Sequence, residues 1–250
     1  MQCILLAAGY ATRLYPLTEN MPKALLKLGD KTILDMVVDK IDEVKDVENT
    51  YIVTNEKFYN NFVTWADGHK GQKPVEVIND HTTNNDNRLG AIGDLKYTID
   101  LKGIDDEILV MACDNIFNFS LNDYVALYRE KNCDMICANR VKDRQELQSM
   151  GVAEIDADGK VLGFEEKPEN PKTDLGVSPF YLYKRDTVSL VNKYLAEGNN
   201  PDAPGNFIPW LIGQKEVYTY VCDAVRIDIG TPESYYDTLE KYKNGTLFKN

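Results

Sequence analysis

The N-terminal stretch that decides the fold reads Gln2-Cys3-Ile4-Leu5-Leu6-Ala7-Ala8-Gly9-Tyr10-Ala11-Thr12-Arg13-Leu14-Tyr15-Pro16-Leu17-Thr18. Its apolar beginning predicts a buried strand over residues 2–8. A small-residue loop with Arg13 follows, and Lys23 lies shortly after it in Met21-Pro22-Lys23-Ala24-Leu25-Leu26. Backbone N–H groups of such a loop can approach a polyphosphate closely, and the two cations can neutralise it. The stretch therefore predicts an enzyme or binder of nucleoside triphosphates.

Two common nucleotide-binding motifs are absent from this stretch. The phosphate loop requires Gly-x4-Gly-Lys-Ser/Thr, and the dinucleotide fingerprint requires Gly-x-Gly-x-x-Gly after the first strand. Neither pattern occurs here. The alternative to a phosphate site is a plain strand and turn followed by a surface arginine.

Composition and charge exclude several classes of protein. The chain has 250 residues, of which 43% are hydrophobic and 27% charged, as in a soluble globular protein. Its net charge of −12 disfavours a nucleic-acid binder, which would usually be basic. No apolar run approaches the roughly 20 residues that cross a bilayer. No cationic segment precedes the first strand, so we expect no signal peptide and a cytoplasmic protein.

The five cysteines do not form a disulfide framework by their spacing. Their number is odd and they are widely separated, except for Cys133 and Cys137 on an expected strand. No histidine lies near that pair, so zinc is not expected and the thiols are interpreted as core residues.

Strand and helix patterns alternate along the first half of the chain. Strands are expected at 50–54, 75–78 and 108–113. Helices are expected at 32–44, from 58 to 65, near 88–98 and at 120–130. Apolar strands that alternate with helices imply a parallel sheet covered on both faces.

The second half has a different pattern. A hairpin is expected from 152–155 and 160–167, with further strands at 177–183 and 217–222. A helix is expected at 186–196, a proline-rich loop at 201–209, and a last helix from Thr231 to Gly245. No linker or repeat interrupts the chain. We expect one domain over residues 1–250, with a Rossmann-like three-layer α/β/α fold and a central mixed, mostly parallel sheet.

Two acidic residues stand where a metal could bind. Asp114 follows the expected strand 108–113, and ligands of open α/β sheets lie outside the carboxyl ends of strands. An aspartate there can ligate Mg²⁺, although it can also cap a turn. Asp228 precedes the helix start Gly230-Thr231-Pro232-Glu233 and can face the same cleft, or serve only as a helix-entry residue.

The N-terminal pattern resembles the signature of the sugar-1-phosphate nucleotidylyltransferases, also called nucleotide-sugar pyrophosphorylases. The positions in register are Gly9, Thr12, Arg13, Leu14, Pro16, Thr18 and Lys23. The string Asp114-Asn115-Ile116-Phe117 is closest to the glucose-1-phosphate thymidylyltransferase-like branch. The resemblance implies a nucleotide-binding half over about residues 1–130 and a sugar-phosphate-binding half over about 131–250.

The resemblance also implies roles for individual residues. Mg²⁺ would be held by Asp114 and Asp228, Arg13 would stabilise the pyrophosphate leaving group, and Lys23 would bridge the α-phosphate. Asp114 would be catalytic as well, and would contact the nucleotide together with Ala7, Ala8, Gly9 and Thr12. In Gly163-Phe164-Glu165-Glu166-Lys167-Pro168, Lys167 would bind the phosphate of the sugar phosphate and Glu166 the sugar; Gly151 and Val177 complete this substrate-binding set.

Glu166 and Lys167 raise a geometric difficulty. Neighbours on a strand point to opposite faces, so both can line one pocket only if the strand bends, for instance where Pro168 ends it. Without the resemblance, an exposed Lys–Glu salt bridge would be the simpler interpretation. Likewise, Gly151 could be a turn glycine.

The segment expected to read the base departs from the family pattern. In Asn84-Asn85-Asp86-Asn87-Arg88-Leu89-Gly90, the helix entry and Gly90 are retained, but the Gln-Pro approach is missing. Arg88 and Gly90 are assigned to nucleotide binding, with phosphate, base or no contact open for Arg88. Gly205-Asn206-Phe207-Ile208-Pro209-Trp210 and Ser178-Pro179 also depart from glucose-specific relatives. A sugar or phosphorylated alcohol other than plain glucose is therefore expected.

The expected reaction needs no protein nucleophile. The substrate phosphate attacks the α-phosphorus of a nucleoside triphosphate in line, and pyrophosphate leaves. The partners are then a triphosphate and a sugar 1-phosphate, with no nucleic acid or membrane and with homo-oligomerisation left open. Two alternatives are a cytidylyltransferase for a phosphorylated alcohol such as phosphocholine, and a non-catalytic nucleotide-sugar-binding regulatory homologue.

Overall fold

The first half of the chain builds a parallel sheet. The computed structural model describes residues 1–223 and 225–249. Its strands β5 (Val75–Asn79), β4 (Asn49–Thr54), β1 (Gln2–Leu6) and β6 (Ile108–Ala112) lie in this order, and each neighbouring pair is parallel. The inner strands β1 and β6 are apolar, from Cys3 onward in β1 and throughout β6, because both of their faces are covered.

The second half extends the same sheet. β11 (Leu175–Tyr183) pairs antiparallel with β6 and also contacts β8 (Asp134–Arg140) and β9 (Gly151–Ile155). β10 (Val161–Glu166) adds to β9, and β12 (Val217–Val221) adds to β8. Of these nine strands, all but β10 and β11 run in the same direction. The expected mixed, mostly parallel sheet is therefore confirmed.

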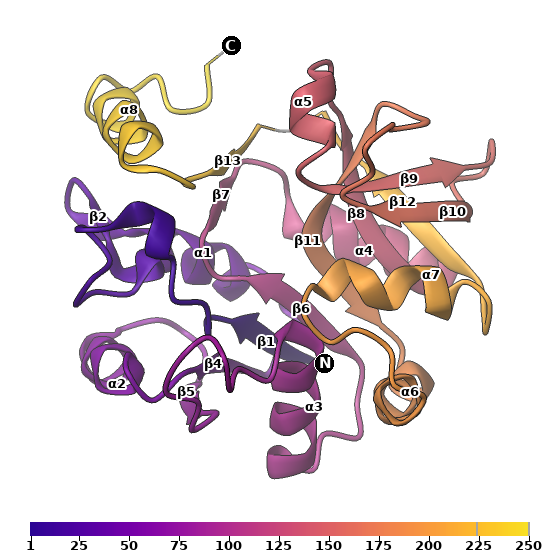
Figure 1. Cartoon of the computed structure of the whole chain (residues 1–250), viewed down its shortest axis with the longest axis horizontal. Coiled ribbons are helices and arrows are strands. Elements are labelled where there is room, and N and C mark those ends of the chain that lie inside the picture. The colour runs from indigo at the N-terminus through magenta and orange to yellow at the C-terminus, as the bar shows by residue number, and fades with distance from the viewer. Residues whose placement is uncertain (224, 250) are drawn as a thin grey trace.

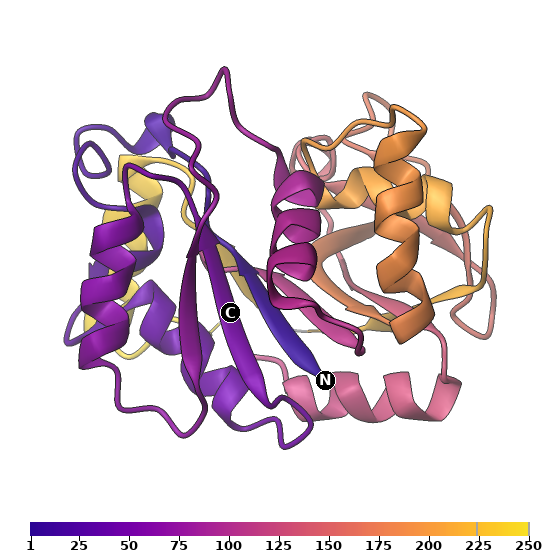
Figure 2. The same cartoon turned by 90° about the horizontal axis from the view of Figure 1, so that it is seen from below.

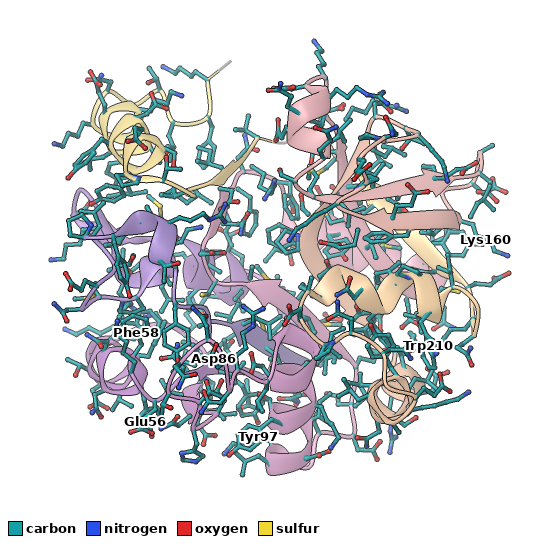
Figure 3. All side chains as sticks on the ribbon, in the orientation of Figure 1. Glu56, Phe58, Asp86, Tyr97, Lys160 and Trp210 are labelled. Atoms are coloured by element: carbon teal, nitrogen blue, oxygen red, sulfur yellow. The ribbon has the colours of Figure 1, made fainter. Side chains whose placement is uncertain are left out.

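Helices cover both faces of the sheet, as Figure 2 shows. On one face, α1 (Ile33–Asp42), α2 (Tyr59–Gly68) and α4 (Leu121–Lys131) pack into a core that includes Cys3 and Leu5. On the other face, α3 (Ala91–Lys102), α6 (Arg185–Ala196) and α7 (Phe207–Leu211) pack against Ile4. Successive residues of β1 point to opposite faces, which produces the three layers.

Local signals place several helix ends. Thr32 caps α1 by accepting a hydrogen bond from Asp35 N at 3.0 Å, and the Asp35 side chain accepts from Thr32 N. Thr231 caps α8 (Pro232–Lys243), with proline at its first position. The short elements are η1 (Thr12–Leu14), η2 (Lys23–Leu25), η3 (Pro204–Asn206), β2 (Lys27–Leu28), β3 (Lys31–Thr32) and α5 (Arg144–Leu147).

A small two-stranded ribbon joins the ends of the two halves. β7 (Asn115–Phe117) follows β6 after a tight turn, and it pairs antiparallel with β13 (Arg226–Asp228). The register places Asp228 opposite Asn115. Figure 1 shows these strands running together between α8 and the main sheet. The ribbon brings residues from distant parts of the chain to one end of β6.

Several sequence expectations were wrong in detail. The first strand ends at Leu6 rather than residue 8, and α3 begins at Ala91 rather than near Arg88. Residues 201–209 were expected to be a loop, but they contain η3 and most of α7. Prolines are tolerated in the first turn of a helix, and buried apolar side chains at Phe207, Ile208 and Leu211 stabilise α7. Among the described residues, no helix combines the length and apolarity that a bilayer span requires.

Candidate active site

Three adjoining cavities lie beyond the carboxyl ends of β1 and β6. The central cavity, about 430 Å³, is lined by Gly9, Arg13, Lys23, Asp114 and Asp228 among others. The α3 cavity, about 310 Å³, includes Ala8, Gly9, Arg88, Gly90 and Asp94. The β9 cavity, about 210 Å³, includes Gly151, Glu166, Val177 and Arg226. Lys167 lines all three, so they form one cleft.

The loop after β1 is held in a fixed shape. Ala7 N donates to Val53 O at 2.9 Å, and Ala8 O accepts from Asn55 Nδ2 at 2.9 Å. Ala11 has a left-handed backbone with φ 46°, and its carbonyl accepts from Thr18 Oγ1 at 2.8 Å. Asn55 and Thr18 are completely buried supports. Sequence reasoning assigned no role to Asn55.

This loop offers free donors. Within residues 1–223 and 225–249, the backbone N–H groups of Ala8, Gly9, Tyr10 and Ala11 have no hydrogen-bond acceptor. Gly9 is exposed, and an added Cβ there would meet nothing within 4 Å. Consecutive free N–H groups in a turn form a concave site for an anion. Ala8 and Gly9 thus belong to a turn that suits an anion, whereas Ala7 lines the central cavity with its N–H already paired; the contact of all three with the nucleotide stays a prediction.

Lys23 lies between the two candidate metal ligands. Its Nζ is 2.7 Å from Asp228 Oδ1 and 2.9 Å from Asp114 Oδ2. Burial of the lysine acts to lower its pKa, but the two carboxylates outweigh it and raise the pKa of Lys23. Burial acts to raise the pKa of Asp228, but the lysine ammonium, with Arg226 and Arg13, lowers it. Both groups are therefore charged, and the carboxyls of Asp114 and Asp228 converge on one point.

A hydrogen-bond chain orients Asp114. Asn115 Nδ2 donates to Asp114 Oδ1 at 2.8 Å, and Arg226 Nη1 donates to Asn115 Oδ1 at 2.7 Å. Asn115 is only 4% exposed. Sequence reasoning did not assign Asn115 or Arg226 to the site. A signal existed, because Arg226 lies two residues before Asp228, and alternate residues of a strand share a face.

Of two neighbouring residues in the N-terminal motif, Arg13 lies in the cleft and Thr12 lies outside it. Arg13 lines the central cavity, and its charge contributes to the lowered pKa of Asp228. Thr12 begins η1, is exposed and lines none of the three cavities. The structure thus brings Arg13, but not the Thr12 side chain, into the cleft.

The chain turns at Lys167, directly after the end of β10, as it must if Glu166 and Lys167 are to line one pocket. β10 ends at Glu166, and Lys167 has a left-handed backbone with φ 50°, although proline follows it. The residue before proline usually avoids helical conformations, so this is a strained position. Lys167 N donates to Met150 O at 3.1 Å. The turn lets both side chains line the β9 cavity.

Gly205 leaves room for the Glu166 carboxyl, and Gly151 leaves room first for the Phe164 ring and second for that carboxyl. A Cβ at Gly205 would lie 2.0 Å from Glu166 Oε2, and one at Gly151 would lie 3.2 Å from it. Burial raises the pKa of Glu166, while Lys167 opposes the shift. Gly151 pairs with Val177 across β9 and β11, and both line the cavity. Gly151 is therefore a strand residue at a close approach, not a turn glycine.

The segment before α3 is tied to the loop at 201–203. Arg88 Nη2 lies 2.7 Å from Asp202 Oδ2, with both side chains half exposed. Gly90 has φ 79°, and a Cβ there would lie 2.6 Å from Pro201 O. Ala91 N and Ile92 N donate to the carbonyls of Asp202 and Pro201 at 3.2 and 2.9 Å. Arg88 thus has a carboxylate partner in the lining of the α3 cavity, and whether it contacts phosphate, base or neither stays a prediction.

The donor set fits Mg²⁺ held jointly with a substrate. Among the described residues, no group of three or more His, Cys, Asp or Glu side chains could hold a metal. Asp114 and Asp228 would supply two carboxylates, both partly exposed to the cavity. Mg²⁺ usually binds one or two carboxylates and takes its other ligands from water and phosphate. The cleft provides this incomplete set.

Comparisons with known proteins find relatives that match nearly the whole chain. A bifunctional protein GlmU of Methanocaldococcus jannaschii is 27% identical over 245 residues, which cover 97% of this chain and 54% of that protein. The chain thus spans about half the length of this relative. A UTP–glucose-1-phosphate uridylyltransferase, AglF, of Haloferax volcanii is 27% identical over 98% of both chains.

Solved structures share the fold over the whole chain. A candidate glucose-1-phosphate thymidylyltransferase from Bacillus anthracis, in complex with sucrose, has a TM-score of 0.80 and 24% identity, covering 100% of this chain and 96% of that one. A UDP-glucose pyrophosphorylase complexed with UDP-glucose has a TM-score of 0.80 and 20% identity, covering 98% of both. The model of the nucleotidyl transferase family matches residues 2–245. The chain therefore belongs to the nucleotidyl transferase family.

Proposed function

We propose that the protein transfers a nucleoside monophosphate from a nucleoside triphosphate to a sugar 1-phosphate, forming a nucleotide sugar and pyrophosphate. The observation that carries this proposal is the convergence of Lys23, Asp114 and Asp228 beside the free N–H groups of the loop after β1. A cation and two carboxylates at an anion-binding turn suit a triphosphate held with a divalent ion. Membership in the nucleotidyl transferase family supports the same reaction class.

The three cavities suit the three parts of the two substrates. The nucleoside would occupy the α3 cavity, the phosphates the central cavity, and the sugar the β9 cavity. Lys167 lines all three, so its ammonium can reach the phosphate that attacks. Two anions must approach each other in a partly buried cleft, where their repulsion is stronger than in water. Lysine and arginine side chains on both sides of the reacting phosphorus reduce this repulsion.

The transfer is a single displacement. An oxygen of the sugar phosphate forms a bond to the α-phosphorus, and the bond from that phosphorus to the pyrophosphate oxygen breaks. Lys167 holds the attacking phosphate, Lys23 binds the α-phosphate, and Arg13 stabilises the charge that develops on pyrophosphate. Bound Mg²⁺, held by Asp114 and Asp228, would neutralise phosphate charge and orient both reactants. Correct orientation alone can lower the barrier by about 7–11 kcal/mol.

The remaining residues of the cleft set its selectivity. Ala7, Ala8 and Gly9 would contact the nucleotide through their backbone, and Gly90 would shape the α3 cavity. Glu166 would bind a sugar hydroxyl between Gly151 and Gly205. We extend the proposal to a sugar other than plain glucose because Ser178-Pro179 and residues 205–210 differ from glucose-specific relatives. A cytoplasmic location and a homo-oligomer stay predictions.

A substrate matrix tests the proposal. Each of ATP, CTP, GTP, UTP and dTTP is combined with several sugar 1-phosphates and with phosphocholine, with and without Mg²⁺, and pyrophosphate is measured. We expect Mg²⁺-dependent release with a sugar 1-phosphate. Pyrophosphate release with phosphocholine, but with none of the sugar 1-phosphates, would instead indicate a phospho-alcohol cytidylyltransferase. Binding of a nucleotide sugar without any turnover would indicate a regulatory protein.

A further inference from the structure

Two buried aspartates meet beside the α3 cavity. Asp80 follows β5 and is 6% exposed, and Asp94 lies in the first turn of α3 and is 5% exposed. Asp80 Oδ1 accepts hydrogen bonds from Thr82 N and Thr82 Oγ1 at 2.7 and 2.8 Å. Asp80 Oδ2 and Asp94 Oδ1 are buried with no donor among the described residues. Two carboxylates left in this state would be costly, because each would be desolvated and would repel the other.

The environment indicates a single proton between them. Burial first, and then the charge and hydrogen bond of Asp80, raise the pKa of Asp94 to about 8. A hydrogen bond between two carboxyl groups exists only when one of them carries a proton. The pair thus resembles two carboxyls that share one proton because both cannot ionise at close range.

Other charged groups nearby do not replace this proton. Arg88, from the segment before α3, pairs with Asp202 of the facing loop. Lys167 lines the same cavity beyond the end of β10. From the loop after β1, Tyr10 faces Asp80, and that charge contributes to raising the pKa of the Tyr10 phenol. Burial and the carboxylate of Asp80 are therefore the main causes that raise the pKa of Asp94.

The pair joins two walls of the α3 cavity. Tyr10, in the loop with free N–H groups, donates its hydroxyl to Thr82 O at 3.3 Å. Thr82 in turn donates to Asp80, and Asp80 contacts Asp94 on α3. Asp94 lines the α3 cavity together with Ala8 and Gly9. One hydrogen-bond chain therefore runs from the loop after β1 to the helix across the cavity.

We propose that Asp80 and Asp94 hold one proton between them and that this proton positions the two walls of the α3 cavity, so that nucleotide affinity falls when it is lost. The inference rests on the proposed function, in which this cavity receives the nucleoside. Neither aspartate was identified from the sequence. Both are positioning residues, because they act through the loop and the helix rather than on the reacting phosphorus.

The proton is tested first on the protein without nucleotide. Infrared difference spectra between pH 6 and pH 10 should contain the C=O band of a protonated carboxylic acid in the wild type. The band should be missing in both Asp94→Asn and Asp80→Asn, since an amide can donate to the remaining carboxylate in place of the proton. Asp100→Asn, an exposed position on the same helix, should keep the band. A wild type with no such band overturns the shared proton.

Nucleotide affinity is tested second. The Kd values of ATP, CTP, GTP, UTP and dTTP are measured by calorimetry at pH 7 and pH 9. We assume that only the protonated pair allows the nucleotide to bind. At pH 9, one unit above a pKa of about 8, the apparent Kd should then be about tenfold higher than at pH 7 for each triphosphate that binds. In Asp94→Asn, the Kd should change less than twofold between pH 7 and pH 9. In Asp100→Asn, it should change as much as in the wild type.

The outcomes separate the inference from the function on which it rests. Tight binding with the same Kd at both pH values, or an equal pH effect in Asp94→Asn, overturns the positioning role and leaves the proposed function intact. Absence of binding to all five triphosphates overturns the proposed function and the positioning role together. The infrared band still decides the shared proton in that case.

Discussion

The ammonium of Lys23 lies 2.7 Å from the carboxylate of Asp228, although 205 positions separate the two residues in the chain. The contact depends on the ribbon of β7 and β13, which places Asp228 opposite Asn115 and so beside Asp114. The three charged groups thus belong to three separate segments that meet only in the folded chain. A lysine between two carboxylates also prevents those carboxylates from repelling each other while no metal is bound.

The first prediction concerns these carboxylates. Asp114→Asn and Asp228→Asn should each reduce Mg²⁺-dependent turnover on the order of 100-fold or more, which is the usual effect of losing one electrostatic contact at a reacting phosphoryl group. Asn keeps the shape of the side chain but removes the charge that a divalent cation needs. Pyrophosphate release at saturating substrates provides the measurement, and circular dichroism checks the fold.

Asp237→Asn serves as the matched control, because Asp237 is an exposed acid of α8 that pairs with Lys241. It should retain full activity. Wild-type turnover in either Asp114→Asn or Asp228→Asn would remove that residue from the proposed metal site.

Much of the fold follows from local sequence patterns. The apolar strand before Gly9 and the alternation of strands and helices were sufficient to predict the three layers and the sheet. Patterns of this kind extend over enough residues for their periodicity to be recognised. The convergence of Asp114 and Asp228 was expected from the family resemblance, whereas the residues alone left open a turn cap at Asp114 and a helix-entry residue at Asp228.

The parts of the site that could not be predicted from the sequence depend on long-range contacts. β7 and β13 have three residues each, too few for a period to show. The left-handed backbone of Lys167 contradicts the preference of a residue before proline, so only the surrounding structure determines it. The partner of Arg88 lies 114 residues away at Asp202. In the sequence, Asp94 is indistinguishable from an ordinary acid in the first turn of a helix, although it is buried against Asp80 in the structure.

A second prediction separates the charge of Lys167 from its backbone. Lys167→Ala and Lys167→Gly should both raise the KM for the sugar phosphate about tenfold or more, since a charged hydrogen bond contributes about 1.5–3 kcal/mol. Only glycine relieves the left-handed backbone at φ 50°. Lys167→Gly should therefore be at least as stable to urea as Lys167→Ala.

Lys172→Ala is the control for Lys167, because Lys172 is an exposed lysine that pairs with Glu165 and lies outside the three cavities. Its KM should match that of the wild type. Unchanged sugar-phosphate kinetics in Lys167→Ala would contradict the assignment of this lysine to the attacking phosphate.

A third prediction concerns the space around Glu166. Gly205→Ala would place a Cβ 2.0 Å from Glu166 Oε2 and 3.0 Å from its carboxyl carbon, so the carboxylate must move. We expect kcat/KM for the sugar phosphate to fall about tenfold or more, while the Kd of the triphosphate stays the same. Gly163→Ala is the control, since its added Cβ would meet only ordinary contacts with Glu154 at 3.6 Å and beyond. Equal kinetics in the two variants would show that the Glu166 position does not matter.

The last prediction tests what holds the second half of the chain together. Asp134 is completely buried at the start of β8, where it accepts hydrogen bonds from Lys184 N at 2.6 Å and from Thr187 Oγ1, and pairs with Lys215 Nζ at 3.2 Å. Asp134→Ala removes one partner of a buried ion pair and leaves these donors without an acceptor. The free energy of unfolding should decrease by about 3 kcal/mol or more.

Asp186 offers a matched comparison because it pairs with the same Lys215 at 2.7 Å, but its side chain is 74% exposed. Asp186→Ala should cost less than about 1 kcal/mol, as exposed ion pairs usually do. Urea unfolding of both variants measures the two costs under the same conditions. If the two costs proved equal, burial would not be what makes the Asp134 contacts more stabilising than an exposed ion pair.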